Sequence, residues 1–214
     1  MPVTNDNQLT LEKTPSYFIT RGVPQRIRRM SPNVRLIIVV RDPVTRAVSD
    51  YAQAVTKRPD VGPFEGLAFL PHSVDNGTGE GSPGAMVDAS WGPIRIGLYA
   101  RHLERWLTEF PIGQMHFVSG ENLVRNPADE MGKVERFLGL RRRIGSTDFQ
   151  LNTTKGFPCI RQVEGKATRT RCLGKTKGRA HPKIDTAALK RLAEFFRPFN
   201  QKFYELSGLD FGWM

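Results

Sequence analysis

The sequence is short of acidic residues and of cysteine, and it has no long apolar run. Its 214 residues contain 21 Asp and Glu against 32 Lys and Arg, which gives a formal net charge of +11 at pH 7. No apolar run approaches the ~20 residues that cross a bilayer. The N-terminus also lacks the basic and apolar regions of a signal peptide. Read by itself, the sequence predicts a soluble chain.

The two cysteines are too few for a zinc site of their own, and no CxxC spacing is present. Cys159 and Cys172 lie in a stretch rich in Gly, Lys and Arg. Either they form one short-loop disulfide, with a stabilisation of about 3 kcal/mol in the chain-entropy description, or they are two free thiols. A disulfide would indicate an oxidising compartment. The glycosylation sequons at Asn76 and Asn152 agree with that compartment.

The excess of basic residues favours a polyanionic partner over a surface that is basic only for solubility. Such a partner is a nucleic acid, a phosphate-bearing ligand or an acidic glycan. Between residues 155 and 183 the only acidic residue is Glu164, so this loop supplies most of the net charge. Glycines alternate with cations over 172–182, which lets backbone N–H groups approach a phosphate as an anion nest. The alternative is a flexible basic loop without a fixed ligand.

The chain is organised around a predicted strand, turn and helix. Residues 36–40 are five apolar residues without polar alternation, which is typical of a strand covered on both faces in a parallel sheet. Asp42 suits a helix N-cap and Pro43 the first helical position. The pattern that follows predicts a helix over 43–57, because apolar residues recur there at three- and four-residue spacing.

Arg41 stands at the carboxyl end of this strand, where open α/β sheets place their ligands. Ser49 lies two turns into the following helix, on one stripe with Thr45 and Gln53. An arginine at the strand end and a serine on the next helix make a candidate anion clamp.

The rest of the chain alternates helices with one more apolar strand. Periodicity and capping residues predict helices over 23–30, 93–110 and 127–138, a last helix after Asp185, and a strand over 115–119. Residues 58–92 read as a long irregular region. This order predicts an α/β fold, a three-layer sandwich around a parallel sheet.

Several motifs in one order resemble the heparan sulfate glucosamine 3-O-sulfotransferases. They cover essentially the whole chain and occupy residues 12–18, 40–51, 117–121, 154–159, 172–182 and 196–200. The resemblance implies a sulfotransferase fold related to P-loop NTPases. It also implies 3′-phosphoadenosine 5′-phosphosulfate (PAPS) as co-substrate, with no metal.

The resemblance assigns roles to four groups of residues. Arg41 and Ser49 match the pair that holds the 3′-phosphate, and Cys159 and Cys172 match a disulfide pair. Further contacts to the nucleotide are implied for Lys177, Gly178, Arg179, Ala180 and His181. Positions lining the acceptor glycan cleft are matched by Lys13, Thr14, Pro15, Ser16, Gln53, Trp91 and Gly92.

The sequence also departs from the family pattern. Family members carry, upstream of 13–16, a first strand, a glycine-rich loop whose lysine grips the 5′-phosphosulfate, and a glutamate base. None has a counterpart here. Residues 1–214 therefore read as a partial sulfotransferase domain, truncated at the N-terminus, with 155–183 as a basic, disulfide-closed loop. No catalytic base is assigned, because Asp42 is explained as a helix cap and Asp50 as a solvated helix residue.

These features predict that the intact protein transfers a sulfuryl group from PAPS to the 3-hydroxyl of glucosamine in heparan sulfate or heparin. The family implies the Golgi lumen and an N-terminal membrane anchor that this chain lacks. The alternative is an inactive fragment that binds heparan sulfate or nucleotide through its basic face. A nucleic-acid partner is not expected, because the chain has no zinc-finger or RNP-type motif.

Overall fold

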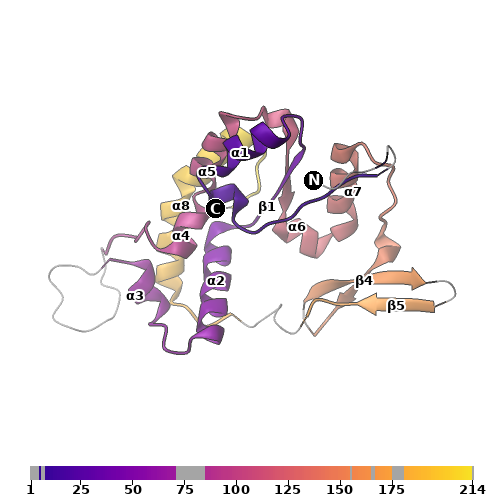
Figure 1. The fold of residues 1–214 in the computed structure, drawn as a ribbon. Coiled ribbons are helices and arrows are strands. Elements are labelled where there is room, and N and C mark those ends of the chain that lie inside the picture. The colour runs from indigo at the N-terminus through magenta and orange to yellow at the C-terminus, as the bar shows by residue number, and fades with distance from the viewer. Residues whose placement is uncertain are drawn as a thin grey trace.

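A computed structural model describes residues 5, 8–70, 85–154, 156–164, 167–174 and 181–213. Two parallel strands, β1 (Leu36–Val40) and β2 (Met115–Ser119), pair in register from one end to the other. Helices α1, α5 and α8 lie to one side of this pair in Figure 1, and α6 and α7 lie to the other. The α/β fold and both predicted strands are confirmed.

Helix α2 (Pro43–Lys57) begins and ends where the sequence predicts. The Thr45 N–H donates to Asp42 Oδ1 at 2.7 Å, and Pro43 occupies the first turn, so the cap forms as expected. The helix buries Ala47, Val48, Tyr51 and Ala52. Its N-terminus is thereby fixed directly after the end of β1.

The single helix predicted over 93–110 is wrong, because the structure has two helices there. Helix α4 (Gly92–Gly97) ends at Leu98, whose backbone leaves the helical region, and α5 (Tyr99–Leu107) follows. The break coincides with a change of packing partner: Ile94 and Leu98 belong to one hydrophobic cluster, whereas Tyr99 and Leu103 belong to the other.

The two clusters form the core. The first lies against the strands and includes Ile38, Phe117, Leu103 and Phe203. The second joins α2, α4 and α8, with buried side chains that include Val48, Phe64, Ile94, Leu192 and Phe196. Helix α8 (Thr186–Ser207) contributes to both clusters and is capped by Asp185, as predicted.

The predicted loop over 155–183 contains regular structure in its described part. Strands β3 (Phe149–Asn152), β4 (Phe157–Glu164) and β5 (Ala167–Arg171) form an antiparallel sheet in the order β3-β4-β5. Cys159 on β4 and Cys172 after β5 form a disulfide. The disulfide prediction is confirmed, and an irregular loop is wrong for these residues. The cross-strand pairing and the disulfide supply order that the Gly- and Lys-rich composition does not reveal.

The remaining elements are short and connect these parts. Helices α1 (Val23–Met30) and α7 (Pro127–Leu138) match their predicted bounds. Helices α3 (Phe64–Ala68) and α6 (Gly120–Arg125) were not predicted, and the first falls in the region expected to be irregular. The part of the chain that the structure describes also contains three 3₁₀ turns: η1 (Tyr17–Ile19), η2 (Ile112–Gln114) and η3 (Ser146–Asp148). Within the described residues, no helix combines the length and the apolar character needed to span a bilayer.

Strand β1 is not covered on both faces, contrary to the prediction. Its Val39 side chain is 62% exposed, while Val40 on the opposite face is 1% exposed. The reason is the position of α7, which packs on β2: the His116 ring stacks on Phe137, and Val118 is 3% exposed. The second layer therefore shields β2 and leaves this part of β1 open.

Candidate anion-binding site

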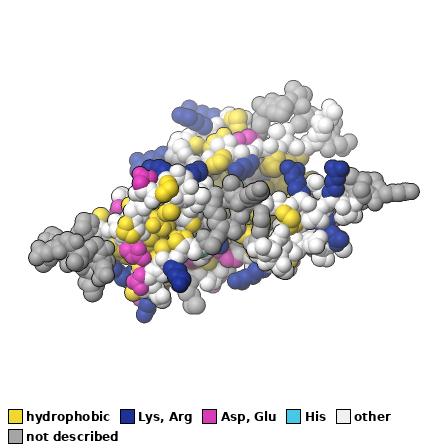
Figure 2. Space-filling model, turned by 90° about the horizontal axis from the view of Figure 1, so that it is seen from below, with side chains coloured by type: hydrophobic (Ala, Val, Ile, Leu, Met, Phe, Trp, Pro, Cys, Tyr) yellow, Lys and Arg dark blue, Asp and Glu magenta, His cyan; other side chains and the backbone are white. Residues whose placement is uncertain are grey.

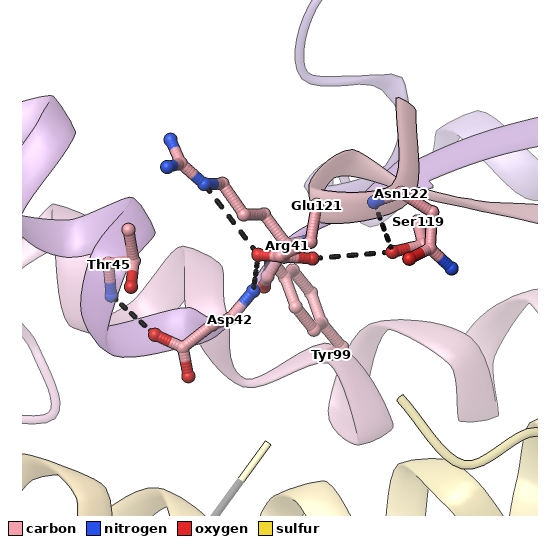
Figure 3. Close-up of polar contacts among 7 residues, drawn as sticks. All are labelled: Arg41, Asp42, Thr45, Tyr99, Ser119, Glu121 and Asn122. Atoms are coloured by element: carbon pink, nitrogen blue, oxygen red, sulfur yellow. Dashed lines mark hydrogen bonds and ion pairs between the residues drawn. The ribbon is translucent and has the colours of Figure 1, made fainter. Parts of the chain in front are cut away.

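The backbone of Arg41 is held by a buried tyrosine from α5. The Tyr99 hydroxyl donates to the Arg41 carbonyl oxygen at 2.9 Å and accepts from the Arg41 N–H at 3.4 Å (Figure 3). Burial raises the pKa of Tyr99 to about 12, so the hydroxyl keeps its proton and remains a donor at neutral pH. The turn between β1 and α2 is thus fixed by a residue to which the sequence assigns no role in the site.

The end of β2 reaches the same turn through Glu121. The Asp42 N–H donates to Glu121 Oε1 at 2.9 Å, and Arg41 Nε lies 3.7 Å from the same oxygen. Glu121 Oε2 accepts a longer bond of 3.4 Å from Ser119 Oγ. The carboxyl ends of β1 and β2 are therefore joined by side-chain contacts as well as by strand pairing.

The strand end is anchored on its other side by a buried carboxylate. Glu130 of α7 is 3% exposed, and its Oε1 accepts from the Ser119 N–H at 2.9 Å. Its Oε2 accepts from Lys133 Nζ at 3.1 Å, a bond that raises the pKa of Lys133. Both oxygens of this buried acid are thereby satisfied.

The terminal nitrogens of Arg41 are available for a ligand. Figure 3 shows them pointing away from Glu121, which is approached only by Nε. The Arg41 side chain is 38% exposed, and its terminal nitrogens have no hydrogen-bond partner within the described residues. A planar guanidinium with two free N–H₂ groups suits bidentate contact with a phosphate or sulfate oxygen pair. The geometry therefore fits an anion.

The polar side chains of α2 differ in whether they have a hydrogen-bond or ion-pair partner. Ser49 is half-buried on α2, and its hydroxyl has no partner among the described residues. By contrast, Arg46 bonds to Asp50 Oδ2 at 2.5 Å and to the Pro93 carbonyl, which ties α2 to α4. Asp50 is therefore an ion-pair partner of Arg46, and its side chain is 40% exposed, in agreement with the solvated residue expected from the sequence. Of the two arginines, Arg41 is the one left for a ligand.

The segment predicted to line the glycan cleft lies beside α5. Lys13, Thr14, Pro15 and Ser16 are exposed and lead into η1. Ser16 has φ 72°, a left-handed conformation that costs energy for a residue with a Cβ. The turn is held from α5 by Trp106 Nε1, which donates to the Phe18 carbonyl at 2.9 Å, and by Arg105 Nη2, which donates to the Ile19 carbonyl at 3.1 Å.

A buried histidine supports the bond between Arg105 and the Ile19 carbonyl. His102 is 6% exposed, and burial lowers its pKa to about 4. The neutral ring has one donor and one acceptor. Nε2 lies 3.1 Å from the Arg95 carbonyl and Nδ1 2.8 Å from Arg105 Nη2, which assigns the proton to Nε2. Sequence reasoning missed this group, because a histidine in an apolar helix stripe carries no signal of its own.

The other side chains predicted to line the glycan cleft contact different parts of the protein. Trp91 is half-buried and meets Phe64 and Tyr51 edge to face, so it packs against the second hydrophobic cluster. Gly92 begins α4, and Gln53 is exposed on α2. No described contact joins Trp91 or Gln53 to the 13–16 segment.

The predicted nucleotide segment lies mostly beyond what is described. Lys177, Gly178, Arg179 and Ala180 fall outside the described residues, as does the Asn76 sequon, and His181 is exposed. In the view of Figure 2, Lys and Arg side chains are distributed from one end of the lower face to the other. The basic character is thus not restricted to one loop.

A cavity of about 580 Å³ opens beside the two strand ends. Its lining includes Asp42, Ser119, Glu121, Lys133 and Trp213, and none of the residues predicted from the sequence to bind nucleotide or glycan. Within the described ranges, no group of three His, Cys, Asp or Glu residues could hold a metal ion. The absence of a metal stays a prediction.

Comparison with known proteins places the chain among sulfotransferases. The model of the sulfotransferase domain matches residues 9–207. The whole chain is 55% identical to human heparan sulfate glucosamine 3-O-sulfotransferases 3B1 and 3A1, covering 52% and 50% of those proteins, and 53% identical to human 3-O-sulfotransferase 6, covering 59%. The chain thus spans about half the length of the curated relatives it matches.

A solved structure shows the same fold. The sulfotransferase from Alicyclobacillus acidocaldarius aligns with a TM-score of 0.61 at 20% identity, over 91% of this chain and 63% of that one. At this identity the likeness concerns the fold alone. Together with the match over residues 9–207, it shows that the chain belongs to the sulfotransferase domain family.

Proposed function

We propose that the protein carrying this chain transfers a sulfuryl group from PAPS to the 3-hydroxyl of glucosamine in heparan sulfate, in the Golgi lumen. The observation that carries the proposal is Arg41, whose free terminal nitrogens stand at the carboxyl end of β1. The similarity over the whole chain to proteins named heparan sulfate 3-O-sulfotransferases supports the choice of donor and acceptor.

Each half of the site has a role in this proposal. Arg41 and Ser49 bind the 3′-phosphate of the nucleotide, and residues 177–181 contact the rest of it. The exposed segment 13–16, with Gln53 and the 91–92 pair, receives the glycan. Two positions on α5 support these halves: Tyr99 bonds to the backbone of Arg41, and Trp106 donates to the Phe18 carbonyl in the turn that follows 13–16.

The chemistry requires a donor, an acceptor and a proton carrier. PAPS supplies the sulfuryl group, whose bond to the bridging phosphate oxygen breaks as a bond to the sugar oxygen forms. The sugar hydroxyl gives up its proton to a base, and cations stabilise the charge that collects on the leaving phosphate. Of the cations in this chain, Arg41 is assigned to the 3′-phosphate and Lys13 to the glycan side, so neither is assigned to the leaving phosphate. We assign none of its carboxylates as the base, because Asp42 caps α2 and Asp50 pairs with Arg46.

Binding of 3′-phosphoadenosine 5′-phosphate (PAP) tests the nucleotide half directly. PAP is expected to raise the melting temperature of the 214-residue chain, and 5′-AMP, which lacks the 3′-phosphate, is expected to raise it less. Arg41→Ala should remove the difference, while Arg29→Ala, which deletes an exposed arginine on α1, should keep it. An equal response to PAP in wild type and Arg41→Ala would contradict the assignment.

Transfer of labelled sulfate tests the reaction. The 214-residue chain is expected to transfer none to heparan sulfate, since it offers no assigned base. A chain extended upstream with the corresponding part of a relative is expected to transfer it. Turnover by the 214-residue chain would show that one of its own residues serves as the base.

A second candidate is a protein that binds sulfated glycan without chemistry. It is favoured by exposed arginines on the β4–β5 hairpin, Arg161 and Arg171, which would attract any polyanion. Such binding weakens steeply with salt. Heparin affinity lost at moderate salt, with no stabilisation by PAP, would support this candidate over a sulfotransferase.

A further inference from the structure

The motif Ser119-Gly120-Glu121 has no role in the function proposed so far, although it meets Arg41 directly. Ser119 ends β2, and Gly120 and Glu121 begin α6. A Cβ placed on Gly120 would lie 3.1 Å from the Val40 carbonyl oxygen and 3.4 Å from Arg41 Cβ. Because both distances are tight, the two strand ends approach so closely that glycine suits this position best.

The close approach brings the next side chain onto Arg41. Glu121 Oε1 accepts from the Asp42 N–H at 2.9 Å and lies 3.7 Å from Arg41 Nε (Figure 3). Tyr99 holds only the backbone of Arg41. Among the described residues, Glu121 is therefore the group that holds the guanidinium itself.

We propose that Glu121 is a positioning residue that orients Arg41 for the 3′-phosphate; this inference rests on the proposed function. Its contact is made with Nε, so both terminal nitrogens remain free for the ligand. Arginine loses much rotamer freedom when it is fixed by a ligand. A side chain fixed beforehand loses less on binding, which strengthens the complex.

The negative charge of Glu121 also acts in the opposite direction, because it repels a bound phosphate. The side chains of Arg41 and Glu121 are 38% and 25% exposed, so solvent screens this repulsion. The hydrogen bond from the Asp42 N–H to Glu121 Oε1 acts at short range and is screened less. We therefore expect the positioning effect to exceed the repulsion.

The test compares two nucleotides that differ at the 3′-phosphate. In wild type, PAP should bind more tightly than 5′-AMP. Glu121→Ala should weaken PAP binding about tenfold, which corresponds to one freed side chain, and leave 5′-AMP binding unchanged. Glu121→Gln keeps an oxygen for the Asp42 N–H and should weaken PAP binding less. Glu104→Ala, which removes an exposed acid from α5, is the matched control and should change neither affinity.

Two outcomes overturn the positioning role: an equal loss for PAP and 5′-AMP in Glu121→Ala, or tighter PAP binding in Glu121→Gln. Failure of the proposed function has a different signature, since wild type would then not distinguish PAP from 5′-AMP.

Discussion

Acidification should destabilise the chain through one buried imidazole. His102 is 6% exposed and sits between the Arg95 carbonyl and the Arg105 guanidinium. Burial is the main cause of its low pKa; the positive charges of Arg105 and Arg46 lower it further, and the bond to the Arg95 carbonyl opposes them. A proton on Nδ1 would remove the acceptor that Arg105 now uses. The native state therefore resists protonation.

The size of the effect follows from the difference in pKa between the two states. The pKa is about 4 in the folded protein against an ordinary value of 6.5. Each unit corresponds to ~1.4 kcal/mol, so the total is about 3 kcal/mol. Between these two pKa values the unfolded chain binds a proton that the folded chain does not. The contribution of His102 to the free energy of unfolding is thus complete above pH 6.5 and is lost as the pH falls toward 4.

The assay is urea denaturation across this pH range for wild type and His102→Gln. Glutamine can donate to the Arg95 carbonyl and accept from Arg105 through its amide, but it does not titrate. The difference in unfolding free energy between the two proteins should change by about 3 kcal/mol from about pH 7 to about pH 4. Other acid-sensitive groups, such as His116, act in both proteins and cancel. Parallel pH profiles for the two proteins would refute the reasoning.

Three further changes test local features by denaturation. Ser16→Gly should stabilise the chain by up to about 1 kcal/mol, because it relieves the left-handed conformation, whereas Ser16→Ala keeps a Cβ and should bring no gain. Gly97→Ala should cost about 2 kcal/mol, because the new Cβ would lie 3.0 Å from the Phe196 ring; Gly113→Ala, in open space, should cost little. Replacing both cysteines by serine should cost about 3 kcal/mol, and adding reductant should then change only wild type.

The sequence predicts the site where its signals are local. Five consecutive apolar residues indicate β1, and the Asp42-Pro43 pair marks the start of α2, so these residues alone place Arg41 at the strand end. The second strand and the caps of α7 and α8 follow in the same way. In each case the residues that carry the signal are close together in the sequence.

The contacts that shape the site are not local. Tyr99 and Arg41 are 58 positions apart, and Glu121 and Asp42 are 79 apart. No periodicity links such pairs, so the sequence assigns neither Tyr99 nor Glu121 a role in the site. The break at Leu98 is hidden for a related reason. The apolar spacing continues through it, although the side chains before and after it join different hydrophobic clusters.

Helix α5 is the common support of both halves of the proposed site. Tyr99 at its start holds the Arg41 backbone, and Trp106, two turns later, holds the turn that follows 13–16. Leu103 between them is fully buried in the first hydrophobic cluster, which fixes the helix against the strands. About seven residues of α-helix span ~10 Å. The backbone of Arg41 and the turn that follows 13–16 are therefore held at a set spacing by α5.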